Sequence, residues 1–131
     1  MAASLAAAAP APSLEVAVDG LRSQRGNLLI CLTRDRRHFP DCSGDPQARK
    51  LTVAAAAHAA RFDDLPAGAY ALSLIHDENG NGKLDTRLGI PREGVGFSRN
   101  PRLMFGPPGF DAVRMEIGAA TSTRVRVKYF F

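Results

Sequence analysis

One stretch of the sequence concentrates side chains whose oxygen atoms could bind a cation. It reads DENGNGKLD and begins at residue 77. Carboxylate or amide oxygens occupy its first, third, fifth and ninth positions, glycine occupies the sixth, and a backbone carbonyl is available at the seventh. This order matches the first nine positions of an EF-hand-type calcium loop, in which alternate residues of a tight turn direct oxygens at one hard cation. The predicted ligands are Asp77, Asn79, Asn81, Asp85 and, through its carbonyl, Lys83.

The match to the calcium loop fails at the twelfth position, where Leu88 replaces the bidentate carboxylate. Glu93 follows the turn at residues 89–91 and is the candidate that could fold back to supply it. With Asp77 and Asp85 as the other charged ligands, we expect calcium to be the cofactor, bound at the ~10⁻⁴–10⁻³ M level of extracellular modules. A second interpretation stays open: Asn and Gly at these places build Asx turns without an ion.

The two cysteines of the chain bracket a second loop. Cys31 and Cys42 flank a segment that contains Pro40, and a hairpin of this length brings two Cα atoms within disulfide range. A disulfide is the favoured state of such a pair in an exported protein. Free thiols, or a metal site that includes His38, are the alternatives, although the spacing matches no standard zinc pattern.

No catalytic constellation accompanies the histidines. The chain has three, at positions 38, 58 and 76. The sequence contains no Gly-x-Ser-x-Gly and no His-Glu-x-x-His motif, and no Cys–His arrangement typical of a nucleophile and its base. We therefore do not expect the protein to be an enzyme.

The basic charge of the chain is dispersed. Lys and Arg number 17 against 13 Asp and Glu, which gives a formal net charge of +4 at pH 7. Arg124, Arg126 and Lys128 alternate with apolar residues, as on the solvated face of a strand. No nucleic-acid-binding motif appears, and no apolar run approaches the ~20 residues of a membrane span. The sequence predicts neither a nucleic-acid partner nor a membrane span.

Short apolar or alternating segments separated by turn residues predict an all-β fold. They are about seven in number and recur every ~8–12 residues, which is typical of an antiparallel, Ig-like β-sandwich. The Ala-rich segment 51–57 could also be helical. The predicted strands are 14–18, 27–33, 51–57, 59–62, 68–75, 113–117 and 121–131. The side chains predicted to face inward are Val16, Leu29, Leu72, Leu74, Val125 and Val127.

Two segments lie outside these strands. A long Gly- and Pro-rich connection spans residues 77–110, and its hydrophobic residues indicate a packed excursion over one end of the sandwich. Residues 1–13 are rich in Ala and Pro, so we expect either a disordered tail or the remnant of a signal peptide. The predicted domain is therefore residues 14–131.

Two blocks of the sequence resemble known families. FDDLPAGAYAL, residues 62–72, resembles the turn-and-strand signature of transthyretin-like and carboxypeptidase-regulatory-like sandwich domains. HDENGNGKLD, which begins at His76, is similar together with GIPREG, GFSRNP and FGPP further along to the DUF2141 family of uncharacterised exported bacterial proteins. The resemblance extends from about residue 14 to the end. It implies a periplasmic or secreted β-sandwich and supplies no catalytic residues.

The expected function is a non-catalytic exported module, for binding or for structure, with a calcium-binding loop at residues 77–85. Its partner would be an unknown protein, glycan or envelope ligand. The alternative is a small hydrolase of the transthyretin-like type. Such hydrolases end in Tyr-Arg-Gly-Ser, whereas this chain ends in Lys-Tyr-Phe-Phe, which argues against that activity.

Overall fold

A computed structural model describes residues 11–103 and 106–131. Most of the predicted tail, up to residue 10, lies outside the described residues, and the first strand already begins at Ser13. The strands are β1 (Ser13–Asp19), β2 (Asn27–Thr33), β3 (Arg49–Ala54), β4 (Ala59–Phe62), β5 (Gly68–Asp77), β6 (Thr86–Arg87), β7 (Ile90–Pro91), β8 (Gly94–Phe97), β9 (Met115–Ile117) and β10 (Ala120–Arg126). The helical turns are η1 (Arg36–His38), η2 (Ala55–Ala57) and α1 (Phe110–Val113).

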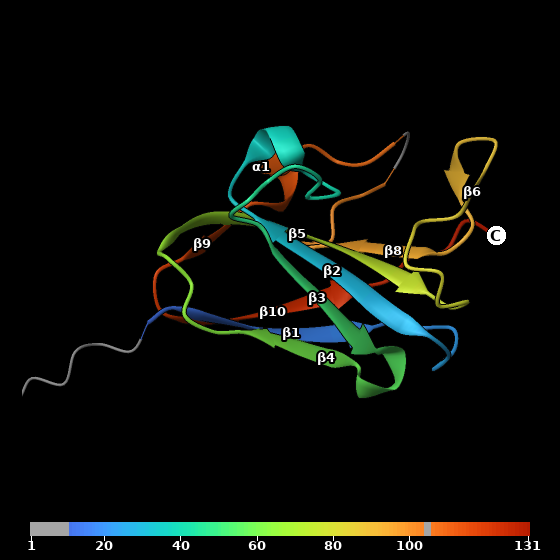
Figure 1. Ribbon diagram of the computed structural model, residues 1–131, viewed down its shortest axis with the longest axis horizontal. Helices are drawn as coiled ribbons and strands as arrows, with labels where there is room; N and C mark the ends of the chain where they lie inside the picture. Colours follow the sequence, from blue (N-terminus) through green and yellow to red (C-terminus); the bar gives the residue numbers. More distant parts are fainter. Residues whose placement is uncertain (1–10, 104–105) are drawn as a thin grey trace, which may run out of the picture.

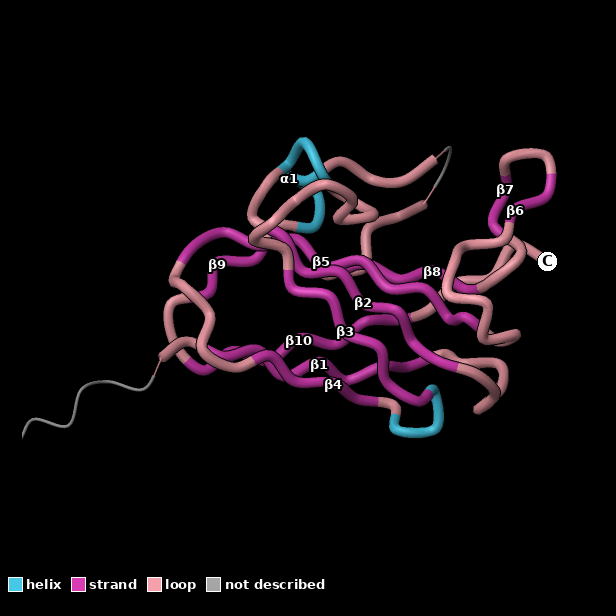
Figure 2. The backbone as a smooth tube through the Cα atoms, viewed as in Figure 1, coloured by secondary structure: helices cyan, strands magenta, loops and turns pink. Residues whose placement is uncertain are grey.

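The strands form two facing layers, which confirms the predicted all-β sandwich (Figures 1 and 2). One layer has the order β10-β1-β4 and the other the order β3-β2-β5-β8, and β9 also pairs with β5. All pairings are antiparallel except that of β1 with β10, which is parallel. A purely antiparallel arrangement was therefore wrong for this pair. The first and last strands therefore lie side by side and run in the same direction.

The main core fills the space between the two layers. Val16, Leu72, Leu74, Val125 and Val127 are buried there, as their alternation predicts. The prediction for Leu29 was wrong: it is only half-buried, and the inward side chains of β2 are the fully or nearly fully buried Leu28, Ile30 and Leu32. The continuous apolar run of β2 has no alternation that sets its phase.

Several elements differ from the sequence prediction, and among them the last strand, predicted over residues 121–131, ends at Arg126. The Ala-rich segment is a strand only to Ala54, and η2 follows it and is capped by His58, which has a φ of 54°. The strand predicted from residue 113 begins at Met115, because α1 occupies the preceding residues. The long connection after β5 is not simply an excursion, since β8 within it pairs with β5 over residues 73–76.

A second, smaller hydrophobic cluster covers the outer face of the larger sheet. Ala71, Val95, Phe97, Phe110 and Val113 are buried in it, and Phe39 and Leu103 pack against them. Next to this cluster, a disulfide joins Cys31 to Cys42 with a Cα–Cα distance of 5.9 Å. The bond ties the loop that holds η1 to β2, so neither free thiols nor a cysteine-ligated metal describes this pair.

Candidate functional site

The candidate cation loop begins at the end of β5. The side chain of Asp77 is buried, and the following residues wrap around it. Its Oδ1 accepts a hydrogen bond from the N–H of Asn81 at 3.2 Å, and its Oδ2 accepts one from the N–H of Gly82 at 2.8 Å. Gly82 has a φ of 78°, a conformation that glycine adopts without a steric penalty. The Asp77 carboxylate thus holds the turn together from the first position of the loop.

Two asparagines form the inner wall of the loop. Asn79 Oδ1 accepts a hydrogen bond from the N–H of Asn81, and Asn81 Oδ1 accepts one from the N–H of Lys83. Both are Asx turns. The amide nitrogens of the two asparagines donate to the Asp85 carboxylate at 2.8 and 2.9 Å, and these bonds lower the pKa of Asp85. The two amide groups and the carboxylate therefore converge on one point.

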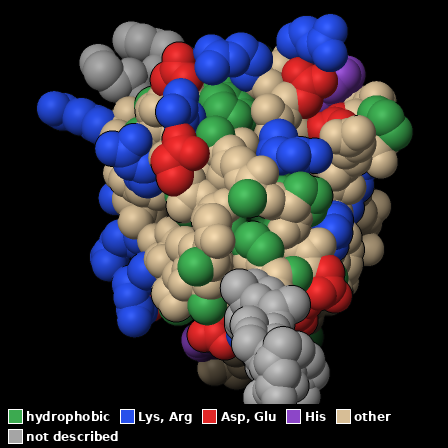
Figure 3. All heavy atoms as spheres, turned by 90° about the vertical axis from the view of Figure 1, so that its left-hand side faces the viewer, with side chains coloured by type: hydrophobic (Ala, Val, Ile, Leu, Met, Phe, Trp, Pro, Cys, Tyr) green, Lys and Arg blue, Asp and Glu red, His purple; other side chains and the backbone are tan. Residues whose placement is uncertain are grey.

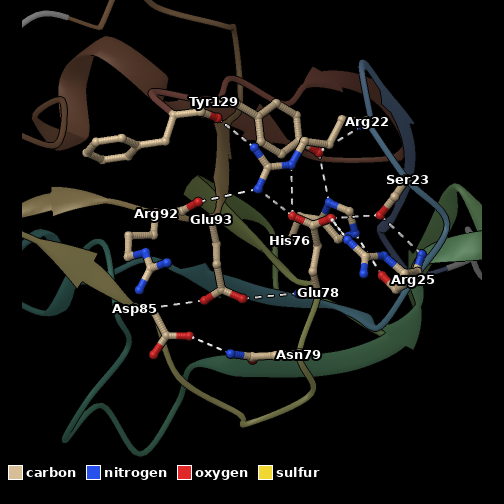
Figure 4. A network of polar contacts seen from close by, with 11 residues as sticks. Arg22, Ser23, Arg25, His76, Glu78, Asn79, Asp85, Arg92, Glu93 and Tyr129 are labelled. Carbon is tan, nitrogen blue, oxygen red and sulfur yellow. Dashed lines mark hydrogen bonds and ion pairs between the residues drawn. The ribbon is translucent and has the colours of Figure 1, made fainter.

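Glu93 folds back onto this loop. Its side chain is buried, Oε1 accepts a hydrogen bond from the N–H of Asp85 at 3.0 Å, and Oε2 accepts one from the N–H of Glu78 at 3.1 Å (Figure 4). The hairpin of β6 and β7 produces the reversal that returns the chain to the loop. Glu93 is thus brought next to the loop that contains Asp77 and Asp85.

The electrostatics of Glu93 reflect crowding by negative charge. Burial raises the pKa of its carboxyl, and the charges of Asp77 and Asp85 raise it further, as does a hydrogen bond with Asp77, while the N–H of Asp85 acts in the opposite direction. Carboxylates crowded in this way repel one another unless a proton or a cation neutralises them.

The oxygen atoms at this site belong to carboxylates, asparagine amides and backbone carbonyls. Within residues 11–103 and 106–131, no group of three or more His, Cys, Asp or Glu side chains is arranged to hold a metal ion. A cation here would need the asparagine oxygens and the Lys83 carbonyl as well as the carboxylates. Each carboxylate oxygen that accepts one N–H keeps a second lone pair, and an asparagine amide can present either its oxygen or its nitrogen. The atoms available here are oxygens, which are the ligands that a hard cation takes.

A network of polar contacts that the sequence did not reveal lies beside the loop (Figure 4). Glu78 accepts hydrogen bonds from Arg22 at 2.6 and 2.9 Å, from Ser23 at 2.8 Å and from Arg25 at 3.2 Å. Burial alone raises the pKa of Glu78, but the hydrogen bonds from Arg22 and Ser23 and the charge of Arg22 outweigh it and hold the pKa at about 2. Glu78 and Arg22 lie 56 positions apart, so no local pattern links them.

His76 connects this network to the end of the chain. The residue is fully buried, its Nε2 lies 2.8 Å from the carbonyl oxygen of Arg25, and its Nδ1 lies 2.8 Å from the hydroxyl of Tyr129. Because a carbonyl can only accept, Nε2 carries the proton, and in the neutral ring Nδ1 accepts from Tyr129. The hydroxyl oxygen in turn accepts from the N–H of Arg22. Both ring nitrogens are thereby engaged.

No helix in the described part of the chain has the length and apolar character needed to cross a membrane.

The comparisons with known proteins give the family of this chain. No curated protein and no solved structure matches the chain. A family model does match, over residues 16–125, and its description is an uncharacterized protein conserved in bacteria. Since the match covers most of the chain, the protein belongs to the DUF2141 family.

Proposed function

We propose that this protein is a non-catalytic exported module whose loop at residues 77–85 binds calcium, with Glu93 as the ligand that completes the site. The observation that carries this proposal is the position of Glu93, which lies buried beside Asp77 and Asp85. Glu93 lies outside the loop in the sequence, and the β6–β7 hairpin brings it back next to the loop.

The choice of calcium follows from the donors. Carboxylate, amide and carbonyl oxygens are the ligands of a hard cation, and the candidate set contains no sulfur or imidazole. Asp77, Asp85 and Glu93 contribute negative charge, and a divalent cation would remove the repulsion that raises the pKa of Glu93. Each asparagine oxygen accepts one backbone N–H and keeps a second lone pair, which it would offer to the ion.

The consequence of binding would be mechanical. Asp77 is the last residue of the central strand β5. Glu93 directly precedes β8, and β8 pairs with β5. An ion held between them would join the end of β5, the β6–β7 hairpin and the start of β8. We infer a rigid loop end that presents a binding surface, with a protein, glycan or envelope component as the partner.

Two further observations support the non-catalytic and exported parts of the proposal. Both nitrogens of the buried His76 are engaged, so this histidine is not offered to a substrate as a base. The disulfide between Cys31 and Cys42 is the kind of bond that persists in oxidising compartments, which favours a periplasmic or secreted location. We also propose that the fold is of the transthyretin-like type, from the sequence resemblance of residues 62–72.

Thermal unfolding with calcium or EDTA tests the proposal. At a calcium concentration of 100 times Kd, binding adds about 2.7 kcal/mol to the free energy of unfolding. For a domain of this size the midpoint temperature should rise by roughly 5–10 °C. The quantity to compare is the difference between calcium and EDTA within each variant, because Glu93→Gln and Asp85→Asn also alter the protein without calcium.

Both variants should lose most of this difference. Glu116→Gln is the matched control, because Glu116 is an exposed carboxylate on β9, far from the loop along β5. It should keep the full calcium response. Equal midpoint temperatures in millimolar calcium and in EDTA for the unaltered protein would refute the proposal, and a response that survives Glu93→Gln would remove Glu93 from the site.

A further inference from the structure

The exposed large hydrophobic side chains gather at one end of the molecule. Among the described residues these side chains are Leu84, Leu88, Ile90, Phe130 and Phe131. The first three belong to the segment that runs through the β6–β7 hairpin, and the other two end the chain. Figure 1 shows the C-terminus next to β6. We call these five residues the apolar tip.

Leu88 is the most unusual member of the apolar tip. Its exposed fraction is 96%, so no part of the fold covers it. It is a central residue of the two-residue turn between the paired Arg87 and Ile90, and its φ of 52° is followed by a φ of 80° at Gly89. Such turns favour Asn, Asp or Gly, since a positive φ is costly for other residues. Folding does not account for leucine here, whereas binding would.

Contacts join the two parts of the apolar tip into one surface. The guanidinium of Arg87 lies over the ring of Phe131, 5.9 Å from its centroid. Arg22 donates a hydrogen bond of 2.7 Å to the Phe131 carbonyl oxygen, and thus ties the last residue to the Glu78 network. The hairpin and Phe131 therefore lie next to each other.

The exposed charged side chains around the apolar tip are basic, whereas Asp85 beside them is half-buried and accepts hydrogen bonds from the amides of Asn79 and Asn81. Lys83, Arg87 and Arg92 are exposed and form no ion pair within residues 11–103 and 106–131. The nearby carboxylates of Asp77 and Glu93 are buried. At the opposite end, acidic and basic side chains lie next to one another (Figure 3). A protruding aliphatic tip surrounded by cationic side chains is complementary to an anionic lipid surface.

We propose that the apolar tip docks the protein onto the surface of an anionic phospholipid bilayer. Leu88 and the two phenylalanines enter the boundary between headgroups and acyl chains, and Lys83, Arg87 and Arg92 contact lipid phosphates. The protruding leucine favours lipid over a protein partner, because leucine is under-represented among the residues that dominate protein interfaces, and Leu88 is the most exposed side chain of the tip. This inference goes beyond the calcium proposal and does not depend on it.

Vesicle sedimentation of the full chain in EDTA tests the inference without calcium. We expect binding to phosphatidylglycerol–phosphatidylcholine vesicles at low salt and little binding to phosphatidylcholine alone. Leu88→Asn should weaken binding about tenfold or more, since it removes a leucine side chain that the bilayer would bury. It should not unfold the protein, because asparagine suits a positive φ. Lys83→Gln should weaken binding roughly fivefold. Lys50→Gln, an exposed lysine on β3 away from the tip, is the matched control and should bind normally.

The absence of tryptophan from the sequence allows a second readout. Leu88→Trp creates a single fluorophore at the apolar tip, and its emission should shift to shorter wavelength when anionic vesicles are added. Ala119→Trp places the same fluorophore on an exposed residue at the opposite end and should show no shift. Failure to bind anionic vesicles would overturn the proposal, even if the tip then captured a protein. Unchanged binding by Leu88→Asn would equally overturn it, since charge alone would then explain the affinity.

Discussion

The carboxylate of Glu93 accepts a hydrogen bond of 3.0 Å from the backbone N–H of Asp85. This contact closes the loop that follows β5, because it connects the residue before β8 to the last of the predicted cation ligands. The carboxylate reaches its partner from the far side of the β6–β7 hairpin. Burial raises the pKa of the same carboxyl, and the charges of Asp77 and Asp85 raise it further.

The calcium response should depend on pH through Glu93. Its pKa is raised in the folded protein, so its ionised form destabilises the fold without calcium, and stability is lost as pH rises through the raised pKa. Calcium needs the ionised form. The rise in unfolding midpoint on adding calcium should therefore be largest at neutral pH and shrink as pH falls through this pKa. Midpoint temperatures measured in calcium and EDTA from pH 4.5 to 7.5 would show it, and a pH-independent response would contradict it.

The ion pair between Arg22 and Glu78 should protect the fold against acid. The pKa of Glu78 is lowered from 4.5 to about 2, so its stabilising contribution is complete above pH 4.5 and is lost as pH falls toward 2. Allowing for the solvent exposure of Arg22, Glu78→Gln should cost about 2 kcal/mol at pH 7 by urea unfolding.

Glu15→Gln serves as the comparison for Glu78→Gln. Glu15 pairs with Arg61, and both side chains are more than half exposed. An exposed ion pair contributes less than about 1 kcal/mol, so this variant should unfold close to the unaltered protein. Equal losses in the two variants would show that the contacts of Glu78 contribute no more to the free energy of unfolding than an exposed ion pair does.

Gly26 should not tolerate a side chain. A Cβ at this position would lie 2.0 Å from the carbonyl oxygen of Asp77, and the φ of Gly26 is 70°. Gly26→Ala should therefore destabilise the protein by roughly 2–4 kcal/mol and displace the start of the cation loop. Gly118→Ala is the control, because a Cβ there meets nothing within 4 Å, and it should unfold normally. Equal stability of both variants would contradict the packing of Gly26 against β5.

Reduction of the disulfide should destabilise the fold without abolishing it. The bond between Cys31 and Cys42 closes a short loop, for which chain-entropy arguments give about 3 kcal/mol. Urea unfolding with and without a reductant measures this, and the midpoint should fall in the reductant. Mass spectrometry after alkylation of the non-reduced protein should show no free thiol, and two alkylated cysteines would contradict the bond.

Local patterns in the sequence were sufficient for part of this structure. Alternation in the strands around Leu72 and Val125 identified inward-facing side chains, because each side chain on a pleated strand points to the face opposite its neighbour's. The spacing of Asp77, Asn79 and Asn81 predicted a calcium loop and left Asx turns as the alternative interpretation. The Asx turns are present, since the bonds that build them join residues a few positions apart.

Other features were decided only by the tertiary structure, because they depend on contacts between distant segments. The apolar run of β2 contains no period, and the packing between the layers selected Leu28 over Leu29 for the core. The parallel pairing of β1 with β10 brings together the two ends of the described fold. Glu93 reaches the loop through the β6–β7 hairpin, and Tyr129 reaches His76 from the segment after β10. Local propensity encodes neither of these contacts.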